Sequence, residues 1–212
     1  DTPVAGYLKL CGGCENSFLL EAVEGGEVLG RHSSIGLDPD LIWRALIGPD
    51  GKNRAQINRA PALTPTAFDD DAAPMMASFQ TVLDASRLDV PEGLAPMAAG
   101  LFGYFGYDTV REVEHLPRPK KNGRDIPTAI FIRPRLVVVF DNIRQEMTFA
   151  TPVRPDDQTN ASDAYAEALE RLARGVAALK NAVPGEATHL SPRHEATSQA
   201  AKPQSNTTRP DF

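Results

Sequence analysis

Residues 97–111 read MAAGLFGYFGYDTVR, with glycine at every third position from Gly100 to Gly106 and aromatic residues between them. Aromatic side chains favour a pleated, half-buried surface, and glycine in a strand allows another backbone or a bulky ring to approach closely. Asp108 is a suitable cap for a helix over 109–116, whose apolar residues have helical spacing. The stretch therefore predicts a buried strand, a tight glycine corner and a short helix.

A phosphate-binding loop is the alternative function for these glycines. Their spacing differs from that of dinucleotide-binding loops, and no Gly-Lys-Ser/Thr follows that could hold a phosphate. Packing against a neighbouring backbone is the better interpretation.

The composition excludes several classes of protein. The chain has 212 residues and a net charge of −6, with no basic stripe that would suit a nucleic acid. No apolar run is long enough to span a bilayer, and the first residues do not have the charged-then-apolar pattern of a leader. Two cysteines do not make a disulfide framework. We therefore expect a soluble, cytoplasmic protein that binds neither nucleic acid nor membrane.

The first half of the chain predicts mostly strands. Residues 4–10 and 28–37 have the composition of strands, and residues 17–23 fit a strand or a short helix. Asp38-Pro39-Asp40 is expected to break the second strand. Residues 41–46 and 55–58 then predict a hairpin, because Gly48-Pro49-Asp50-Gly51 between them is a strong turn signal.

The second half predicts two loops, two helices and a long hairpin. Residues 64–74 predict a polar loop, 74–87 a helix, and 120–124 a basic loop. Residues 129–153 predict a hairpin, with a bulge or strand start at Pro134 and burial on both faces over 136–140. A last helix is expected over 162–179. Its predicted cap is Ser162, and its predicted inward residues are Tyr165, Leu169, Leu172, Val176 and Leu179.

Together these elements predict an α+β fold with antiparallel, sandwich-like sheets and a few flanking helices. The domain is expected to cover residues 1–183. Residues 184–212 are rich in Pro, Ser, Thr, Gln and Asn, which predicts a linker or a disordered tail.

Two motifs could form a redox or metal site, but the residues around them support neither function. Cys11-Gly-Gly-Cys14 fits a redox pair or half of a zinc site, yet no second cysteine pair follows and the four histidines are scattered. A glycine turn with two incidental thiols is favoured. Asp69-Asp70-Asp71 could bind a divalent ion, but a solvated loop is favoured. We predict no catalytic residue and no metal ligand in this chain.

Three stretches resemble a known family in order and spacing: residues 16–26 (NSFLLEAVEGG), 30–39 (GRHSSIGLDP) and 100–108 (GLFGYFGYD). They are similar to the amino-terminal region of anthranilate synthase component I, a chorismate-utilising enzyme. The resemblance covers about 1–153 and extends to the helix at 162–179, and Ser205–Thr208 is similar to the join with the catalytic half. The same region of aminodeoxychorismate synthase is the nearest alternative, and a free-standing ligand-binding module is another.

The resemblance implies a role in tryptophan biosynthesis. The family converts chorismate, with glutamine or ammonia, to anthranilate and pyruvate. It uses Mg²⁺ and a glutamine amidotransferase subunit or domain. Its chorismate and Mg²⁺ residues lie in a carboxy-terminal chorismate-binding domain that this chain lacks. The chain by itself is thus expected to hold no cofactor, to be non-catalytic, and to serve as a regulatory and scaffold part of the lyase.

The resemblance also implies a tryptophan feedback site at Leu20, Glu21, Ala22, Arg31 and Ser33. Glu21 could pair with the ammonium group of a bound amino acid, although an exposed strand carboxylate is the simpler interpretation. This chain has Ala22 where the family has serine, and His32-Ser33-Ser34 where the family often has Tyr-Ser-Phe. We therefore expect weakened or absent inhibition by L-tryptophan.

Overall fold

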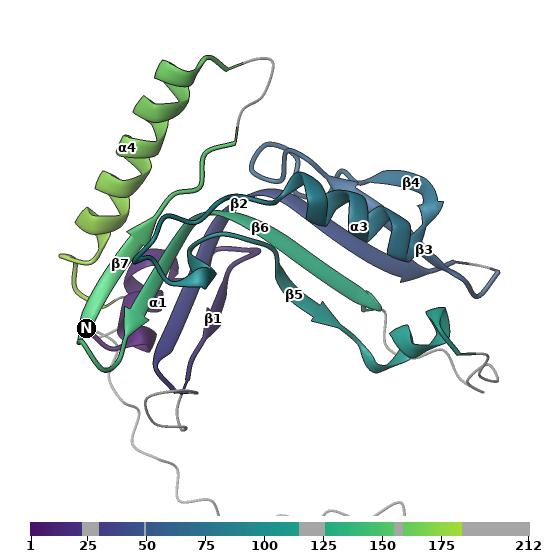
Figure 1. Ribbon diagram of the computed structural model, residues 1–212, viewed down its shortest axis with the longest axis horizontal. Helices are drawn as coiled ribbons and strands as arrows, with labels where there is room; N and C mark the ends of the chain where they lie inside the picture. The colour runs from purple at the N-terminus through teal and green to yellow at the C-terminus, as the bar shows by residue number, and fades with distance from the viewer. Residues whose placement is uncertain (23–29, 49, 115–125, 155–158, 184–212) are drawn as a thin grey trace, which may run out of the picture.

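The computed structural model describes residues 1–22, 30–48, 50–114, 126–154 and 159–183 (Figure 1). Seven antiparallel strands form one sheet, in the order β4-β3-β2-β6-β5, with β1 on β2 and β7 on β6. The elements are α1 (Pro3–Cys11), β1 (Phe18–Leu20), β2 (His32–Ile47), β3 (Asn53–Asn58), β4 (Asp69–Pro74), α3 (Met75–Ala85), η1 (Pro96–Ala98), β5 (Phe102–Phe105), η2 (Tyr107–Glu112), β6 (Ala129–Asp141), β7 (Glu146–Ala150) and α4 (Ala161–Ala178). The predicted α+β class with antiparallel strands and flanking helices is confirmed.

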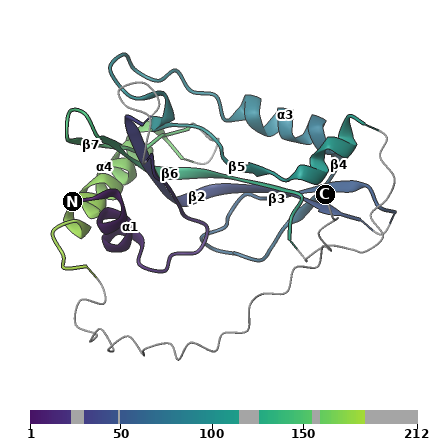
Figure 2. The same cartoon turned by 90° about the horizontal axis from the view of Figure 1, so that it is seen from below.

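Two long strands organise the sheet. The 16 residues of β2 and the 13 residues of β6 run side by side, and both bend near their middle (Figure 1). Helices α1 and α4 lie together at one end of the sheet, and α3 lies at the other (Figure 2). The bend therefore divides one sheet into two halves, each with its own helical cover.

Each half has a separate apolar core. Trp43, Met75 and Val82 belong to the core beneath α3, with Phe79 and Phe131 packed against it. At the other end, residues from β2 and β6 meet residues from α1 and α4. This second core contains Ile35, Leu37, Leu136, Val138 and Phe140, with Tyr7, Leu10, Leu19, Met147, Phe149 and Leu172 packed against it.

The predicted break at residues 38–40 is wrong, because β2 continues through it to Ile47. Asp38 has a positive φ of 54°, and the pairing with β6 shifts between Pro39 and Leu41. Pro39 lies opposite Pro134, and each proline is flanked by charged residues. Arg135 donates to Asp38 at 2.7 Å, and Arg133 donates to Asp40 at 2.6 Å. A bulge held by two ion pairs thus bends the strand without ending it.

The predicted strand at 4–10 is wrong, because these residues form α1. The Thr2 hydroxyl accepts a hydrogen bond from the amide of Ala5 at 3.2 Å, and Pro3 begins the helix. Both features stabilise a helix amino terminus. The buried Gly6 faces the ring of Phe140, so the helix lies close to the sheet.

The predicted loop at 64–74 is correct only for its first part, because Asp69–Pro74 forms the edge strand β4. Its backbone pairs with β3, and Gln56 donates to Asp70 at 2.8 Å. The acidic composition of this segment is typical of a solvated loop. The unpaired edge of β3 nevertheless favours pairing of the backbone as a strand.

The last helix is correct in extent, but its predicted cap is wrong, and only two of its five predicted inward residues are partly buried. Asn160 caps α4 by accepting from the amide of Asp163 at 3.0 Å. The buried residues are Ala168, Arg171 and Gly175. Of the predicted stripe, Tyr165, Leu169 and Val176 are exposed, while Leu172 and Leu179 are partly buried. Small residues let α4 approach the sheet, and Gly175 faces Leu136 and Phe149 there.

The stretch at 97–111 forms a strand as predicted, but β5 is a partly exposed edge strand. Gly103 lies against the backbone of Ile130, which confirms the packing role expected for the glycines. A 3₁₀ helix, η2, stands where the α-helix over 109–116 was predicted. Asp108 does not cap it and instead pairs with Arg111 at 3.1 Å.

Other predictions are confirmed, or lie outside the described residues. Both hairpins, the helix after Pro74 and the burial of residues 136–140 are confirmed. The basic loop at 120–124, the start of the strand predicted at 28–37 and the tail at 184–212 lie outside the described ranges. Among the described residues, no helix is long and apolar enough to cross a membrane.

Candidate functional site

The five predicted site residues lie at the end of β1 and the start of β2. The two strands are antiparallel, with Leu20 opposite Ser34. Beyond the last strand pair, the amide of Ala22 donates to the Ser33 hydroxyl at 3.1 Å. The fold therefore brings residues 20–22 beside residues 31–33, two segments that eight residues separate in sequence.

Leu20 and Ser33 lie on opposite faces of the sheet. Leu20 shares a face with Ser34 and is 55% exposed. Ser33 points to the opposite face with Phe140, and it is fully buried. Glu21 is exposed. A ligand at this place can reach Leu20 and Glu21 directly, whereas the Ser33 hydroxyl already accepts a protein hydrogen bond.

Arg31 is bound to Asp141 at the far end of β6. Its Nε and terminal nitrogen lie 2.9 Å and 2.6 Å from the same carboxylate oxygen, and His32 Nε2 lies 3.7 Å from that oxygen. The other oxygen of Asp141 accepts from the amides of Ile143 and Arg144, both at 3.0 Å. Arg31, followed by the amide of Arg144, holds the pKa of the Asp141 carboxyl well below its usual range.

Replacing Asp141 by asparagine is expected to make the stability less sensitive to acid. The carboxylate is favoured in the folded state, so its contribution is present above the ordinary pKa of about 3.9 and is lost as the pH falls toward the lower folded pKa. Thermal unfolding between about pH 6 and pH 2 measures this, and the wild type should lose more stability than Asp141→Asn. Parallel curves for the two proteins would contradict the prediction.

A cavity of about 290 Å³ adjoins Arg31. It lies between the ends of β2, β6 and β7 and residues 93–96. Its lining includes Arg31, His32, Asp141, Arg144, Glu146 and Thr148. The sequence analysis missed the last four, because only the pairing of β2 with β6 and of β6 with β7 places them beside residues 31 and 32. The hairpin predicted over residues 129–153 was the one signal that pointed to this place.

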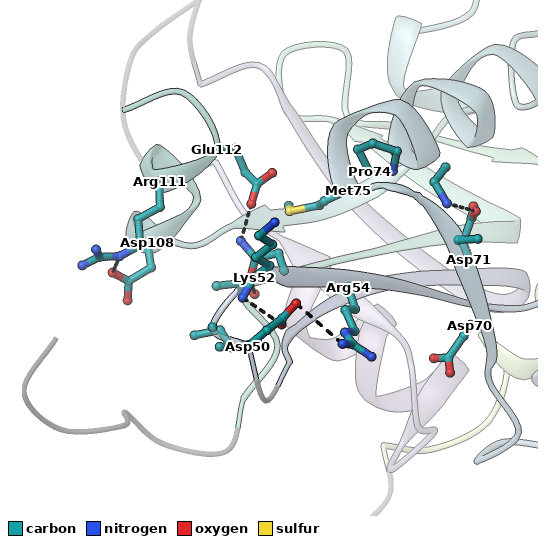
Figure 3. Close-up of a pocket in the computed structure, with 16 residues that line it drawn as sticks. Asp50, Lys52, Arg54, Asp70, Asp71, Pro74, Met75, Asp108, Arg111 and Glu112 are labelled. Atoms are coloured by element: carbon teal, nitrogen blue, oxygen red, sulfur yellow. Dashed lines mark hydrogen bonds and ion pairs between the residues drawn. The ribbon is translucent and has the colours of Figure 1, made fainter. Parts of the chain in front are cut away.

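A larger open cleft of about 660 Å³ lies at the other end of the sheet (Figure 3). Its walls carry charged residues that pair with one another: Arg54 lies 3.7 Å from Asp50, and Glu112 accepts from Asn53 at 2.7 Å. Asp71 accepts from the amide of Ala73 at 2.9 Å. Across the residues the structure describes, no group of three His, Cys, Asp or Glu side chains is placed to hold a metal ion. These side chains of the cleft are thus held by neighbours within it.

The two cysteines lie at the carboxyl end of α1. Cys11 is buried and Cys14 is exposed, and neither is in a disulfide. An activated redox thiolate usually lies at a helix amino terminus, where the helix dipole favours negative charge. The opposite placement here argues against a thioredoxin-like activity.

Comparison with curated proteins finds several relatives that share one name. The chain is 38% identical over 186 residues to anthranilate synthase component 1 of Cereibacter sphaeroides, covering 88% of this chain and 36% of that protein. Its sequence is homologous to the amino-terminal region of anthranilate synthase component 1. Other relatives of the same name are those of Pseudomonas aeruginosa (35% identical, 81% of this chain and 34% of the relative) and Synechocystis sp. (28%, 90% and 36%).

This anthranilate synthase component 1 homologue spans about a third of the length of the curated relatives it matches. No protein-family model matches the chain. Among solved structures, anthranilate synthase component I from Streptococcus pneumoniae TIGR4 superposes with a TM-score of 0.48 and 15% identity, covering 82% of this chain and 35% of that one.

Proposed function

We propose that this chain is the regulatory and scaffold part of an anthranilate synthase component 1 in the cytoplasm. The remainder of such an enzyme would bind chorismate and Mg²⁺, and a glutamine amidotransferase subunit or domain would supply ammonia. The chain by itself would neither convert chorismate nor hold a cofactor. Homology to proteins of that name supports the assignment, since the chain matches only a third of their length.

We propose further that the chain carries part of a tryptophan feedback site. The observation that supports this most is the hydrogen bond between the Ala22 amide and the Ser33 hydroxyl, because it joins the two segments that the resemblance singled out. Exposed Glu21 can pair with the ammonium group of the amino acid, and Leu20 offers an apolar surface beside it. Arg31 and Ser33 would hold the two segments in place through Asp141 and Ala22.

Catalysis is tested with chorismate, Mg²⁺ and ammonium ions, with anthranilate fluorescence as the readout. The 212-residue chain should form no anthranilate. The same sequence joined to the remainder of the enzyme should form it. Anthranilate produced by the chain alone would contradict the proposal that this part is non-catalytic.

Replacing Ala22 by serine is expected to tighten tryptophan inhibition of the full-length enzyme. A serine hydroxyl can add one hydrogen bond to the ligand, worth about 0.5–1.5 kcal/mol, which corresponds to roughly two- to tenfold in the inhibition constant. Ala177→Ser, on the exposed side of α4, is the matched control and should leave inhibition unchanged. Identical inhibition curves for the Ala22→Ser variant and the wild type would exclude Ala22 from the site.

A further inference from the structure

The junction between α1 and β1 holds two thiols in a tight turn. Helix α1 ends at Cys11, and the amide of Cys14 donates to the Cys11 carbonyl oxygen at 2.6 Å. Gly13 has a φ of +119°, a conformation that other residues rarely adopt. The chain therefore folds back directly after the helix and brings Cys14 next to Cys11.

Side-chain contacts place the Cys11 sulfur atom within this turn. Cys11 Sγ lies 2.9 Å from Ser17 Oγ and 4.0 Å from the carbonyl oxygen of Cys14. Ser17 Oγ in turn donates to the Cys14 carbonyl oxygen at 2.9 Å. Partial desolvation, followed by a hydrogen bond with the Cys11 thiol, raises the pKa of Cys14 to about 11. The two thiols are thus direct neighbours.

The neighbours differ in their access to solvent. Cys11 is 2% exposed, whereas Cys14 is exposed. A reagent in solution can therefore reach Cys14 but not Cys11. This is the arrangement of an attacking cysteine with a resolving partner behind it.

We propose that Cys11 and Cys14 form an intramolecular disulfide when the protein meets a small-molecule disulfide such as oxidised glutathione. The Cys14 thiolate attacks one sulfur of the reagent, which forms a mixed disulfide and releases one glutathione thiolate. The Cys11 thiolate then attacks Cys14 Sγ, which forms the Cys11–Cys14 bond and releases the second glutathione. The two cysteines lose two electrons and two protons, and the reagent gains them as two glutathione thiols.

The raised pKa of Cys14 distinguishes this pair from a redox catalyst, whose attacking thiol has a low pKa. Only a small fraction of the thiol is ionised at neutral pH, so the first step is slow. Oxidation also removes the Cys11 thiol as a hydrogen-bond donor to Ser17. Ser17 bonds Tyr7 of α1 at 3.0 Å and directly precedes Phe18 of β1. The modification therefore acts on the connection between the helix and the strand that leads to Leu20.

Intact-mass analysis after incubation with oxidised glutathione tests the proposal on the 212-residue chain. The wild type should become two hydrogen atoms lighter, retain no glutathione and show no thiol that can be alkylated after denaturation. Cys11→Ala should accumulate one glutathione on Cys14, because the resolving thiol is absent. Cys14→Ala should stay unmodified, because Cys11 is buried.

The pH dependence gives a second readout. The rate of the wild-type reaction should rise about tenfold per pH unit from about pH 7 to pH 10, since the thiolate fraction rises that way below the pKa. An ordinary exposed thiol, such as that of free cysteine, should level off near pH 8.5. A stable glutathione adduct on the wild type, two unreacted thiols, or disulfide-linked dimers in place of the internal bond would each overturn the proposal.

Discussion

Replacing Trp43 by alanine is expected to lower the free energy of unfolding by about 3–5 kcal/mol. Trp43 is the one tryptophan in the sequence and is 0% exposed, at the centre of the core beneath α3. Its ring lies 5.0 Å from that of Phe79 and 6.2 Å from that of Phe131, measured between centroids. Alanine would leave a cavity that the closely packed side chains around it can fill only in part.

The same substitution also removes a buried hydrogen bond. Trp43 Nε1 donates to Ser78 Oγ at 2.9 Å, and Ser78 is fully buried in α3. Because a domain of this kind is stable by only about 5–15 kcal/mol, the loss is a large share of the total. Urea unfolding followed by circular dichroism measures it, since the variant has no tryptophan fluorescence.

Two further variants serve as controls for Trp43→Ala. Trp43→Phe keeps most of the ring contacts but loses the hydrogen bond to Ser78, and its stability should fall between those of the wild type and the alanine variant. Met76→Ala, on the exposed side of α3, should change stability by less than about 0.5 kcal/mol. An alanine variant at Trp43 that unfolds at the same urea concentration as the wild type would contradict this description of the core.

Replacing Gly103 by alanine is expected to cost about 3 kcal/mol, near the upper end for overpacking. A Cβ atom at this position would overlap the carbonyl oxygen of Ile130 and lie 2.7 Å from the Cα of Phe131. Both are backbone atoms of β6, the strand that pairs with β5. They cannot move without disturbing the centre of the sheet, so β5 itself would separate from its neighbour.

Thermal unfolding measures the effect of Gly103→Ala, with an expected drop of roughly 6–12 °C for a domain of this size. Gly36→Ala is a graded control, because its new Cβ would meet the ring of Phe18, a side chain that can turn away. We expect a smaller loss there. An unchanged melting temperature for Gly103→Ala would show that β5 does not lie against β6 as described.

Hairpins and the amphipathic helix after Pro74 could be predicted from the sequence because their signals are local. The turn at residues 48–51 joins two strands that pair directly, and the β-branched run in β6 is long enough to indicate a buried strand. The strand predicted at 4–10 failed for the converse reason: Val4, Tyr7 and Leu8 are compatible with either structure, and the cap at Thr2 decides.

The candidate site was predicted from resemblance, not from residue chemistry. Leu20 to Ala22 carry no pattern that indicates a ligand, and Glu21 by itself reads as an exposed carboxylate. Asp141 and Glu146 could not have been found this way, since they are more than a hundred residues away from Arg31. Only the pairing of β2 with β6 and of β6 with β7 makes them neighbours.

The sequence by itself determined the antiparallel class, the turns of the two hairpins and the packing role of Gly103, because each depends on the spacing of neighbouring residues. The tertiary structure decided which face of α4 is buried, that β2 continues through Asp38-Pro39-Asp40, and that Arg31 is paired with Asp141. These three outcomes depend on partners far away in sequence: the closely packed sheet under Gly175, the Arg-Pro-Arg segment of β6 and the β6–β7 turn. The position in which a side chain is most stable depends on the residues it contacts. Contacts between residues far apart in sequence form only when the chain folds.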